Sequence, residues 1–444
     1  MRVVHVANEC APIYKTGGLG DVVGSLPFAL HKLGVETAVI IPDYGFIKHK
    51  PRVLNGKVPV IYAQSKWFTK PNPEHDHKIQ APKYAHFALV ALQKLTELNF
   101  IPDIIHCHDW HASLIAPLIK SGQFPLLSKT KVLLTLHNIA FQGRFPKSYV
   151  NYPELALVKN LFIKSKSQIN FLKEGIQAAD FISTVSPNHA REIRKIVKIG
   201  FGLNQVIKRK RGKFVGILNG IDYAIWKPKT DSLLKHQFNR TSVFIQKPQN
   251  KAYLQKLLGL PVAPNLPVFG YVARLSQQKG IDLVIELIRQ SAKRPMQIVI
   301  LGKGGRKTEA ILEKLCMELK GRLSINLGFN ESLAHQIYAS SDFFLMPSYY
   351  EPCGLTQMIS MRYGTLPIAS AVGGLKDSIK NNQTGFLFSD LTAIGLMNAV
   401  DRALTMWQNE KEYRYMVERA MRQDFSWKRS AKKYIKLYNQ LLRN

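Results

Sequence analysis

The sequence is poor in cysteine and in long apolar runs, and each shortage excludes a class of protein. Four cysteines in 444 residues, without paired spacing, argue against a disulfide-built scaffold or a zinc ribbon and favour a reducing compartment. No run approaches the roughly 18 apolar residues that a transmembrane helix needs. The N-terminal MRVVHVANECAPIY has the short apolar run of a buried strand, not the long apolar core of a signal peptide. We therefore expect a cytoplasmic protein without a membrane span.

Acidic residues are also scarce, since 30 Asp and Glu stand against 62 Lys and Arg, a formal charge of +32. Such an excess would suit nucleic acid or an anionic membrane as partner. The basic residues are dispersed, however, and their densest run, residues 208–211, is short. The sequence has no zinc finger, RNA-recognition aromatic signature or heptad zipper. We interpret the charge as a generally basic surface and expect no specific nucleic acid and no membrane as partner, although a nucleic-acid-binding protein stays open on charge alone.

Runs rich in Val, Ile, Leu and Phe alternate with helical patterns along the chain, and the alternation occurs twice. Runs this apolar fit parallel strands that are buried on both faces. Helices are expected between them, for example over 22–33, 281–291, 307–319 and 392–406. The pattern predicts an α/β protein of two doubly wound, Rossmann-like domains. The expected strands are 3–7, 37–41, 104–108, 132–137, 181–185 and 215–218 in the first half, and 268–273, 297–301, 324–327, 343–346, 366–369 and 385–388 in the second.

The domain boundary is expected after Asp222, because strand alternation stops there until about Pro267. We predict an N-terminal domain over 1–222, a C-terminal domain over 223–426, and a helix over 427–444 that packs back across the domain junction. In two open sheets that face each other, ligands bind outside the carboxyl ends of the strands. The active site is therefore expected in a central cleft, on residues that directly follow strands.

A glycine-rich loop, KTGGLGDV at 15–22, follows the first expected strand and opens a helix. Glycines let a backbone approach a ligand, and free N–H groups at a helix start suit a phosphate. The spacing fits neither the dinucleotide fingerprint nor the Walker loop. Two interpretations stay open: a phosphate-binding loop, or a tight turn in which Asp21 is the N-cap of the helix.

Two segments of the second half carry charged residues just after expected strands. Arg274 ends one strand and Lys279 precedes a helix, so the pair would clamp a departing diphosphate unless both are only solvated surface charges. Glu351, in YEPCGLT, suits a sugar hydroxyl or else caps the helix that starts near residue 354. Gly373 and Gly374 repeat an open backbone after a further strand.

Histidines follow two expected strands of the first half, in HDWHA at 108–112 and in HNIAFQG at 137–143. A lone histidine is usually structural, whereas two with an aspartate suggest a metal. His108 and His111 have no thiolate or third ligand at ligand spacing. We therefore expect no metal site.

Taken in order, seven motifs resemble the bacterial glycogen synthases and plant starch synthases of glycosyltransferase family five. They are KTGGLGDV, HDWHA, HNIAFQG, TVSP, LNGID, ARLSQQKG and YEPCGLTQM, and the resemblance runs from residue 1 to about residue 440. The resemblance implies the GT-B architecture. It also implies retaining transfer of glucose from ADP-glucose to the non-reducing end of an α-1,4-glucan (glycogen or a maltooligosaccharide), with release of ADP and without a metal or other cofactor.

The same resemblance implies roles for individual residues. Arg274 and Lys279 would hold the diphosphate, while Glu351 would bind the glucose 3-hydroxyl and stabilise positive charge at the anomeric carbon. The eighth position after Glu351, where a second acid could stand, is occupied by Ile359. A front-face mechanism is therefore expected instead of the two-carboxylate route of retaining glycosidases. Phe329 would stack on adenine. The implied catalytic residues are Glu351, His137, Arg274 and Lys279, and the implied substrate-binding residues are Lys15, Gly17, Gly18, Asp21, Asp109, Asn219, Phe329, Cys353, Gly354, Leu355 and Thr356.

Departures from the family pattern concern the substrates. The segment 44–95 is shorter than the corresponding segment of the family usually is. Within it, residues 81–87 read APKYAHF where the family has an Asn-Ala-Glu-Arg-Phe helix. Ser370 and Val372 replace an arginine and a threonine near the phosphate site. Two alternatives follow. One is a related α-glucosyltransferase that uses UDP-glucose or a small acceptor, and the other is a weakly active glucan-binding relative of the synthases.

Overall fold

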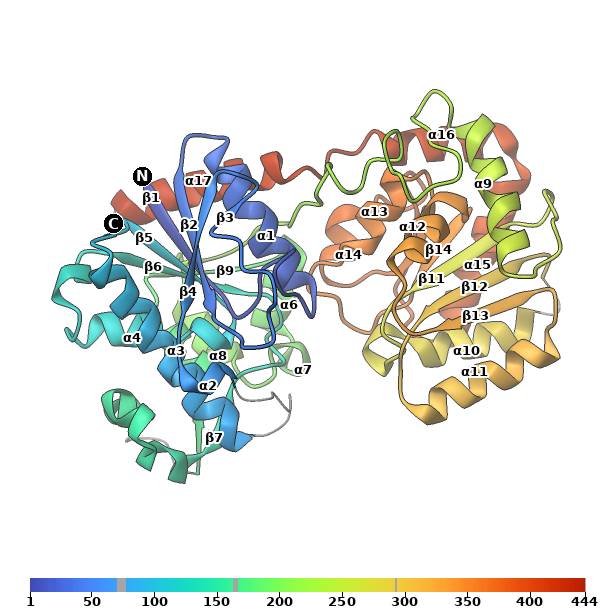
Figure 1. Ribbon diagram of the computed structural model, residues 1–444. Coiled ribbons are helices and arrows are strands. Elements are labelled where there is room, and N and C mark those ends of the chain that lie inside the picture. Colours follow the sequence, from blue (N-terminus) through green and yellow to red (C-terminus); the bar gives the residue numbers. More distant parts are fainter. Residues whose placement is uncertain (70–76, 163–166, 292–293, 444) are drawn as a thin grey trace. The chain divides into compact units, whose positions relative to one another are not determined.

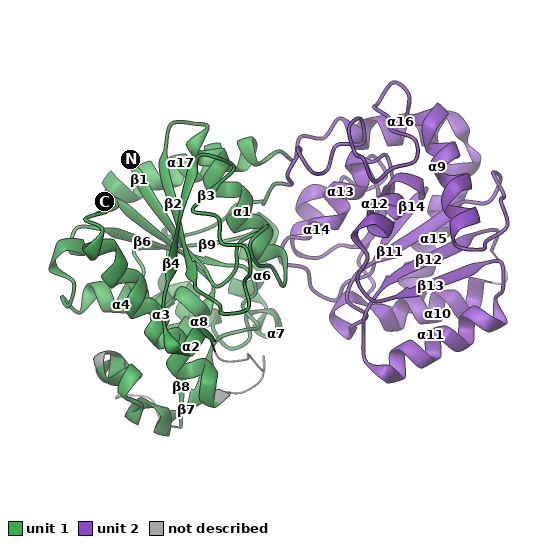
Figure 2. Cartoon of the chain, viewed as in Figure 1, with its two compact units in different colours: residues 1–220, 426–444 green, residues 221–425 purple. Residues whose placement is uncertain are grey.

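The computed structural model describes residues 1–69, 77–162, 167–291 and 294–443. The chain divides into two compact units, which we call unit 1 (Met1–Gly220 and Ser426–Asn444) and unit 2 (Ile221–Phe425) (Figure 2). Each unit is built on a sheet with helices packed on its two faces (Figure 1). The α/β class with two doubly wound, Rossmann-like domains is therefore confirmed.

The main sheet of unit 1 has the strand order β10-β9-β6-β5-β1-β2-β4-β3. All neighbours run parallel except β3 and β4, which form an antiparallel edge. A separate two-stranded sheet pairs β7 with β8. The strands are β1 (Arg2–Val6), β2 (Glu36–Pro42), β3 (Val53–Leu54), β4 (Val58–Ala63), β5 (Ile104–His108), β6 (Lys131–Leu136), β7 (Arg144–Pro146), β8 (Gln168–Asn170), β9 (Phe181–Thr184) and β10 (Phe214–Gly216).

Helices of unit 1 come from both ends of the chain. The helix α17 belongs to this unit, and its Tyr434 and Tyr438 share a buried cluster with Leu26 and Leu30 of α1. Gly220 allows the close approach, because a Cβ there would lie 2.7 Å from the backbone nitrogen of Trp427. The helices are α1 (Gly18–His31), α2 (Lys66–Thr69), α3 (His77–Glu97), η1 (Trp110–Ala112), α4 (Ile115–Lys120), η2 (Pro125–Leu127), η3 (Lys147–Asn151), η4 (Pro153–Phe162), α5 (Phe171–Ala178), α6 (Pro187–Lys195), α7 (Val197–Gly200), α8 (Asn204–Arg209) and α17 (Trp427–Arg443).

The sheet of unit 2 is parallel throughout, in the order β13-β12-β11-β14-β15-β16. The strands are β11 (Val268–Val272), β12 (Gln297–Gly302), β13 (Leu323–Leu327), β14 (Phe343–Met346), β15 (Leu366–Ser370) and β16 (Phe386–Phe388). The helices are α9 (Val243–Leu257), η5 (Gln277–Lys279), α10 (Ile281–Gln290), α11 (Arg306–Glu318), α12 (Glu331–Ser340), α13 (Thr356–Arg362), α14 (Gly373–Ser378), α15 (Ala393–Gln408) and α16 (Glu410–Met421).

Each sheet has a point at which the chain reverses its direction of travel across the strands. In unit 1 this point lies between β1 and β5, and in unit 2 it lies between β11 and β14. Loops that leave the carboxyl ends of the two strands at such a point diverge to opposite faces and leave a crevice for a ligand. The loops after these four strands are therefore the places where the fold favours a ligand site.

Candidate functional site

In unit 2, an ion pair joins the loop after β11 to the loop after β14. Lys279 Nζ lies 2.5 Å from Glu351 Oε2, and Ser348 Oγ donates to the same carboxylate oxygen over 3.2 Å. The Glu351 side chain is 7% exposed and the Lys279 side chain 22%. The interpretation of Glu351 as a helix cap is wrong, because α13 has Leu355 at its N-cap without a side-chain hydrogen bond. The arrangement holds a shielded carboxylate beside a cation that is partly open to solvent.

Close backbone packing holds the Glu351 loop in place. Gly374 N donates to the Glu351 carbonyl oxygen over 3.0 Å. A Cβ on Gly374 would lie 2.2 Å from the carbonyl oxygen of Cys353. Gly280, with φ 69°, is equally confined, since its Cβ would lie 1.9 Å from the Pro347 carbonyl oxygen. Glycine is thus required where these loops cross.

The other residues implied in unit 2 lie on loops after β11, β13 and β14 and differ in exposure. Arg274 is exposed just after β11, and Cys353 is buried. Phe329, after β13, is 89% exposed, which is unusual for a large aromatic ring. Gly354 has a φ of 71°, Leu355 is the N-cap of α13, and Thr356 is its first residue.

In unit 1, the glycine-rich loop is organised by Glu9, a residue that the motif analysis missed. The buried Glu9 carboxylate accepts hydrogen bonds from Thr16 N (2.5 Å), Thr16 Oγ1 (2.6 Å) and Gly20 N (2.9 Å). One signal was available: Glu9 is an acid directly after the first strand, in a chain that has few acids. The loop conformation therefore depends on a buried carboxylate behind it.

The exposed side of the same loop carries the residues named from the sequence. Lys15 Nζ donates to Asp21 Oδ1 over 2.7 Å. Gly17 and Gly18 are exposed, and Gly17 is the N-cap of α1. The interpretation of Asp21 as the N-cap is wrong, because it lies in the first turn of α1.

The loops after β5 and β6 are tied together by Asp109. Its Oδ1 accepts hydrogen bonds from the backbone nitrogens of His137 (2.7 Å) and Asn138 (3.3 Å). Burial raises the pKa of Asp109 to about 7, although these two hydrogen bonds lower it. Burial also lowers the pKa of His137 to about 3, so its ring is neutral at pH 7. Asn219, after β10, is buried, and its Oδ1 has no hydrogen-bond partner among the described residues.

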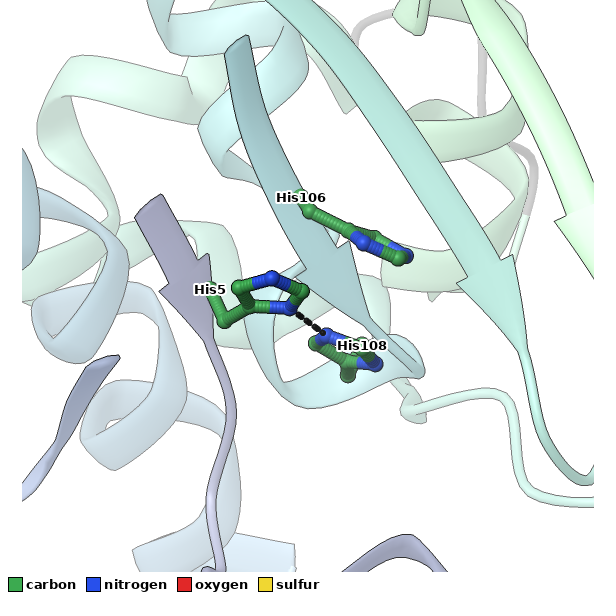
Figure 3. Close-up of side chains that lie close together, drawn as sticks. All are labelled: His5, His106 and His108. Atoms are coloured by element: carbon green, nitrogen blue, oxygen red, sulfur yellow. Dashed lines mark hydrogen bonds between the residues drawn. The ribbon is translucent and has the colours of Figure 1, made fainter. Parts of the chain in front are cut away.

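Three buried histidines from β1 and β5 lie within reach of one another (Figure 3). Nitrogens of His5, His106 and His108 lie within 4.8 Å, a donor set that zinc accepts. Two of the rings stack, however, with 4.2 Å between the centroids of His106 and His108, and His5 Nδ1 is hydrogen-bonded to His108 Nε2 over 3.1 Å. Imidazole lone pairs lie in the ring plane, so stacked rings do not aim at one point. The three rings therefore fit a packed core better than a metal.

Both nitrogens of His106 are also engaged in hydrogen bonds. Nδ1 lies 2.8 Å from the Tyr438 hydroxyl and Nε2 lies 2.6 Å from Thr135 Oγ1. A metal would have to displace one of these partners.

The residues that depart from the family pattern lie in α3 and between β15 and α14. The segment 81–87 lies within α3, where Lys83 is buried with its Nζ 4.7 Å from the centroid of the Tyr44 ring. Burial lowers the pKa of Lys83 to about 8. Ser370 ends β15 with a buried hydroxyl that has no partner among the described residues, and Val372 is the N-cap of α14.

Among the described residues, no helix combines the length and the apolar character that crossing a membrane requires.

Comparison with known proteins covers both units. Residues 2–209 match the starch synthase catalytic domain family, and residues 260–423 match the glycosyl transferases group 1 family. The chain is 35% identical to a glycogen synthase of Bacillus cereus (strain ATCC 10987 / NRS 248) and 37% identical to one of Streptococcus sanguinis (strain SK36), each over 100% of both chains.

Solved structures of glycosyl-transferring enzymes also match this chain. The catalytic domain of starch synthase IV from Arabidopsis thaliana, bound to ADP and acarbose, matches with a TM-score of 0.90 and 34% identity over 100% of this chain and 99% of that one. Sucrose-phosphate synthase from Thermosynechococcus elongatus, 20% identical with a TM-score of 0.68 over 100% of this chain and 99% of that one, shares the fold. The resemblance seen in the motifs is thereby confirmed, and the chain belongs to the glycogen and starch synthase family of GT-B glycosyltransferases.

Proposed function

We propose that this protein is a glycogen synthase that transfers glucose from ADP-glucose to the non-reducing end of an α-1,4-glucan and releases ADP. Family membership over the whole chain supports the reaction class, because the curated relatives are glycogen synthases. The matching starch synthase IV structure is bound to ADP and acarbose, which supports an adenine nucleotide and an oligosaccharide as ligands.

The observation that carries the proposal is the pair formed by Lys279 and Glu351 at the carboxyl end of the sheet in unit 2. Nucleotide-sugar transfer separates charge, since the departing diphosphate gains negative charge while the anomeric carbon becomes positive. Lys279, with the exposed Arg274, would neutralise the diphosphate, and Glu351 would bind a sugar hydroxyl and stabilise the anomeric carbon. Fixed charges aimed at developing charge are commonly the largest contribution to catalysis.

The transfer keeps the anomeric configuration by a front-face route. The bond between the anomeric carbon and the diphosphate oxygen breaks, and the acceptor hydroxyl oxygen forms its bond on the same face. The acceptor proton passes to the departing diphosphate, so the products are ADP and the glucan longer by one residue. This route needs no second protein carboxylate, in agreement with Ile359 at the eighth position after Glu351.

Residues of unit 1 are assigned further substrate contacts. Gly17 and Gly18, exposed beside Lys15 and Asp21, would present backbone N–H groups to the phosphate. His137 and the residues Asp109 and Asn219 would contact the glucosyl group or the acceptor. In unit 2, Phe329 would stack on adenine, and the segment of Cys353, Gly354, Leu355 and Thr356 would add backbone donors.

We further propose that the reaction needs no metal ion, because Arg274 and Lys279 already offer cationic charge for the diphosphate. We expect the enzyme to keep its full activity after treatment with EDTA. A loss of activity that magnesium restores would contradict this part of the proposal. We also propose a cytoplasmic location for the enzyme.

The deciding experiment measures nucleotide release by the purified full chain with ADP-glucose or UDP-glucose, with and without glycogen. We expect ADP release that depends on glycogen and falls by about 10²–10³-fold in Glu351→Gln and in Lys279→Ala. The matched controls are Lys314→Ala and Glu318→Gln, because these residues form an exposed Lys–Glu pair in the same unit. The controls should keep the activity of the unmodified enzyme.

The other outcomes separate the alternatives. Release of UDP in place of ADP would identify the related α-glucosyltransferase. Release only with maltose or a maltooligosaccharide would assign a small acceptor. Glycogen binding without release from either donor would identify a glucan-binding relative of the synthases.

A further inference from the structure

A chain of buried histidines leads from the core of unit 1 to His137. His137 Nε2 lies 2.9 Å from His108 Nδ1, and His108 Nε2 lies 3.1 Å from His5 Nδ1. The second contact is the dashed line in Figure 3. This chain of histidine side chains thus runs from the loop after β6 to β5 and on to β1.

All three rings of this chain are neutral near pH 7. Burial lowers the pKa of His5 and of His137 to about 3. Burial also holds the pKa of His108 well below its usual value, and the neighbouring histidines lower it further. A neutral imidazole carries one proton, on either Nδ1 or Nε2, and offers a lone pair at the other nitrogen.

The two contacts couple the three tautomers. Each contact needs an N–H on one side and a lone pair on the other. If His108 carries its proton on Nδ1, then His137 accepts at Nε2 and must carry its own proton on Nδ1. The bare Nε2 of His108 then accepts from Nδ1 of His5. The rings are therefore all Nδ1–H or all Nε2–H, since any mixture breaks a buried hydrogen bond.

The inner end of the chain distinguishes the two sets. His5 Nε2 is buried and has no hydrogen-bond partner among the described residues. The all-Nε2–H set would bury an N–H donor there without an acceptor, and such orphaned donors are rare in folded proteins. The all-Nδ1–H set leaves only a lone pair at that position, while His5 and His108 both donate within the chain.

We propose that His5 and His108 are positioning residues that hold His137 as its Nδ1–H tautomer. Nδ1 is the ring nitrogen that His108 does not engage, so His137 would offer an N–H donor to its ligand. The identity of this ligand, an oxygen of the glucosyl group or of the acceptor, rests on the proposed function. The tautomer itself rests on the hydrogen-bond chain alone.

The first test is nitrogen-15 NMR of the full chain labelled at histidine, in which protonated and bare ring nitrogens differ strongly in chemical shift. His137→Gln identifies the signals of His137 by their loss. We expect a protonated Nδ1 and a bare Nε2 at pH 7. The reverse pattern in the unmodified protein would overturn the proposal.

The second test compares two substitutions of His5. In His5→Asn, the side-chain amide nitrogen takes the approximate place of Nδ1 and still donates to His108, whereas His5→Leu removes the donor. We expect His5→Asn to keep the His137 signature. We expect His5→Leu to show mixed tautomers and a kcat lowered about tenfold with a smaller change in KM, as the loss of one hydrogen bond to the reacting groups would produce.

His106→Phe is the matched control, because the His106 ring stacks against His108 and lies beside His5 but bonds to Thr135 and Tyr438 instead. It should lower the melting temperature and leave the His137 tautomer unchanged. An unchanged tautomer in His5→Leu would overturn the proposal. If His5→Leu does not fold, the spectra of the unmodified protein and of His5→Asn still decide.

The outcomes for the two proposals are separable. The Nδ1–H signature in a protein that transfers no glucose would contradict the proposed function and leave the tautomer assignment standing. Glucose transfer by a protein that shows the Nε2–H signature would contradict the tautomer assignment and leave the proposed function standing.

Discussion

Lys279 Nζ and Glu351 Oε2 lie 2.5 Å apart, although the two residues are separated by 72 positions in the sequence. The pair depends on parallel pairing between β11 and β14, which brings the carboxyl ends of these strands together. Each partner therefore holds the other where the proposed reaction needs a cation and a carboxylate.

The Lys279–Glu351 pair should show strong coupling in stability. Lys279→Met leaves the Glu351 carboxylate, 7% exposed, without its cation. Removing one partner of a fully buried pair costs about 3–5 kcal/mol, and the partial exposure of Lys279 reduces the expected loss to about 2 kcal/mol. The double variant Lys279→Met/Glu351→Gln should recover much of it. Urea denaturation of the unmodified protein, Lys279→Met, Glu351→Gln and the double variant checks this. Strictly additive losses in the free energy of unfolding would show that the pair is not coupled.

Glu9 should matter for activity although it need not touch substrate. Glu9→Gln replaces a carboxylate oxygen by an amide NH₂ group, which cannot accept from Thr16 or Gly20. Hydrogen bonds to charged groups contribute about 1.5–3 kcal/mol each, so kcat/KM should fall by about one to two orders of magnitude. The matched control is Glu36→Gln, an exposed acid of the same unit. Equal activity of the two variants would remove the organising role assigned to Glu9.

Asp109 should make stability depend on pH in a direction opposite to that of an ordinary ion-paired aspartate. Its pKa is about 7 in the folded protein, against a usual value of 3.8, because burial disfavours the charged form. The folded state thus holds a proton that the unfolded state releases. The resulting stabilisation is complete below about pH 4 and is lost as the pH rises through about 7.

Asp109→Asn imitates the protonated carboxyl and keeps an Oδ1 acceptor for the His137 and Asn138 backbone. Its unfolding free energy relative to the unmodified protein should therefore increase by about 4 kcal/mol between pH 4 and pH 8. Guanidinium denaturation at a series of pH values measures this difference. Parallel curves would mean that Asp109 is ionised throughout the range.

Gly374→Ala should disturb the Glu351 loop by sterics alone. The added methyl would lie 2.2 Å from the Cys353 carbonyl oxygen, so backbone has to move. Overpacking of this kind costs about 1–3 kcal/mol, and displacement of Glu351 should lower kcat. Gly305→Ala is the control, because nothing lies within 4 Å of a Cβ built there. Thermal melting and the nucleotide-release assay should both separate the two variants.

The sequence predicts the central strands well because their burial on both faces makes them continuously apolar. The ranges expected for 104–108 and 343–346 agree with β5 and β14. The strands β3, β4, β7 and β8 were not predicted. The first two form an antiparallel edge and the others a separate short pair, so partial exposure removes the apolar signal.

The site was predictable as motifs but not as contacts. Placement just after a strand identified Glu351 and Lys279 separately, whereas their mutual bond follows only from the pairing of β11 with β14. Asp21 has the side chain of a good N-cap, so local preference suggested a cap. The helix begins at Gly18 instead, three residues before Asp21, and the Asp21 carboxylate accepts a hydrogen bond from Lys15. Glu9 escaped notice because its three hydrogen bonds go mostly to backbone, which leaves no partner motif in the sequence.

The place of α17 has a consequence for synthesis of the protein. Unit 1 takes its first 220 residues and its last segment from opposite sides of unit 2 in the chain. On the ribosome, unit 2 is therefore made in full while the face of unit 1 that receives Tyr434 and Tyr438 is still bare. Such transiently exposed apolar surface invites aggregation or chaperone binding. Deletion of α17 would therefore leave bare a face built from residues that precede unit 2 in the sequence.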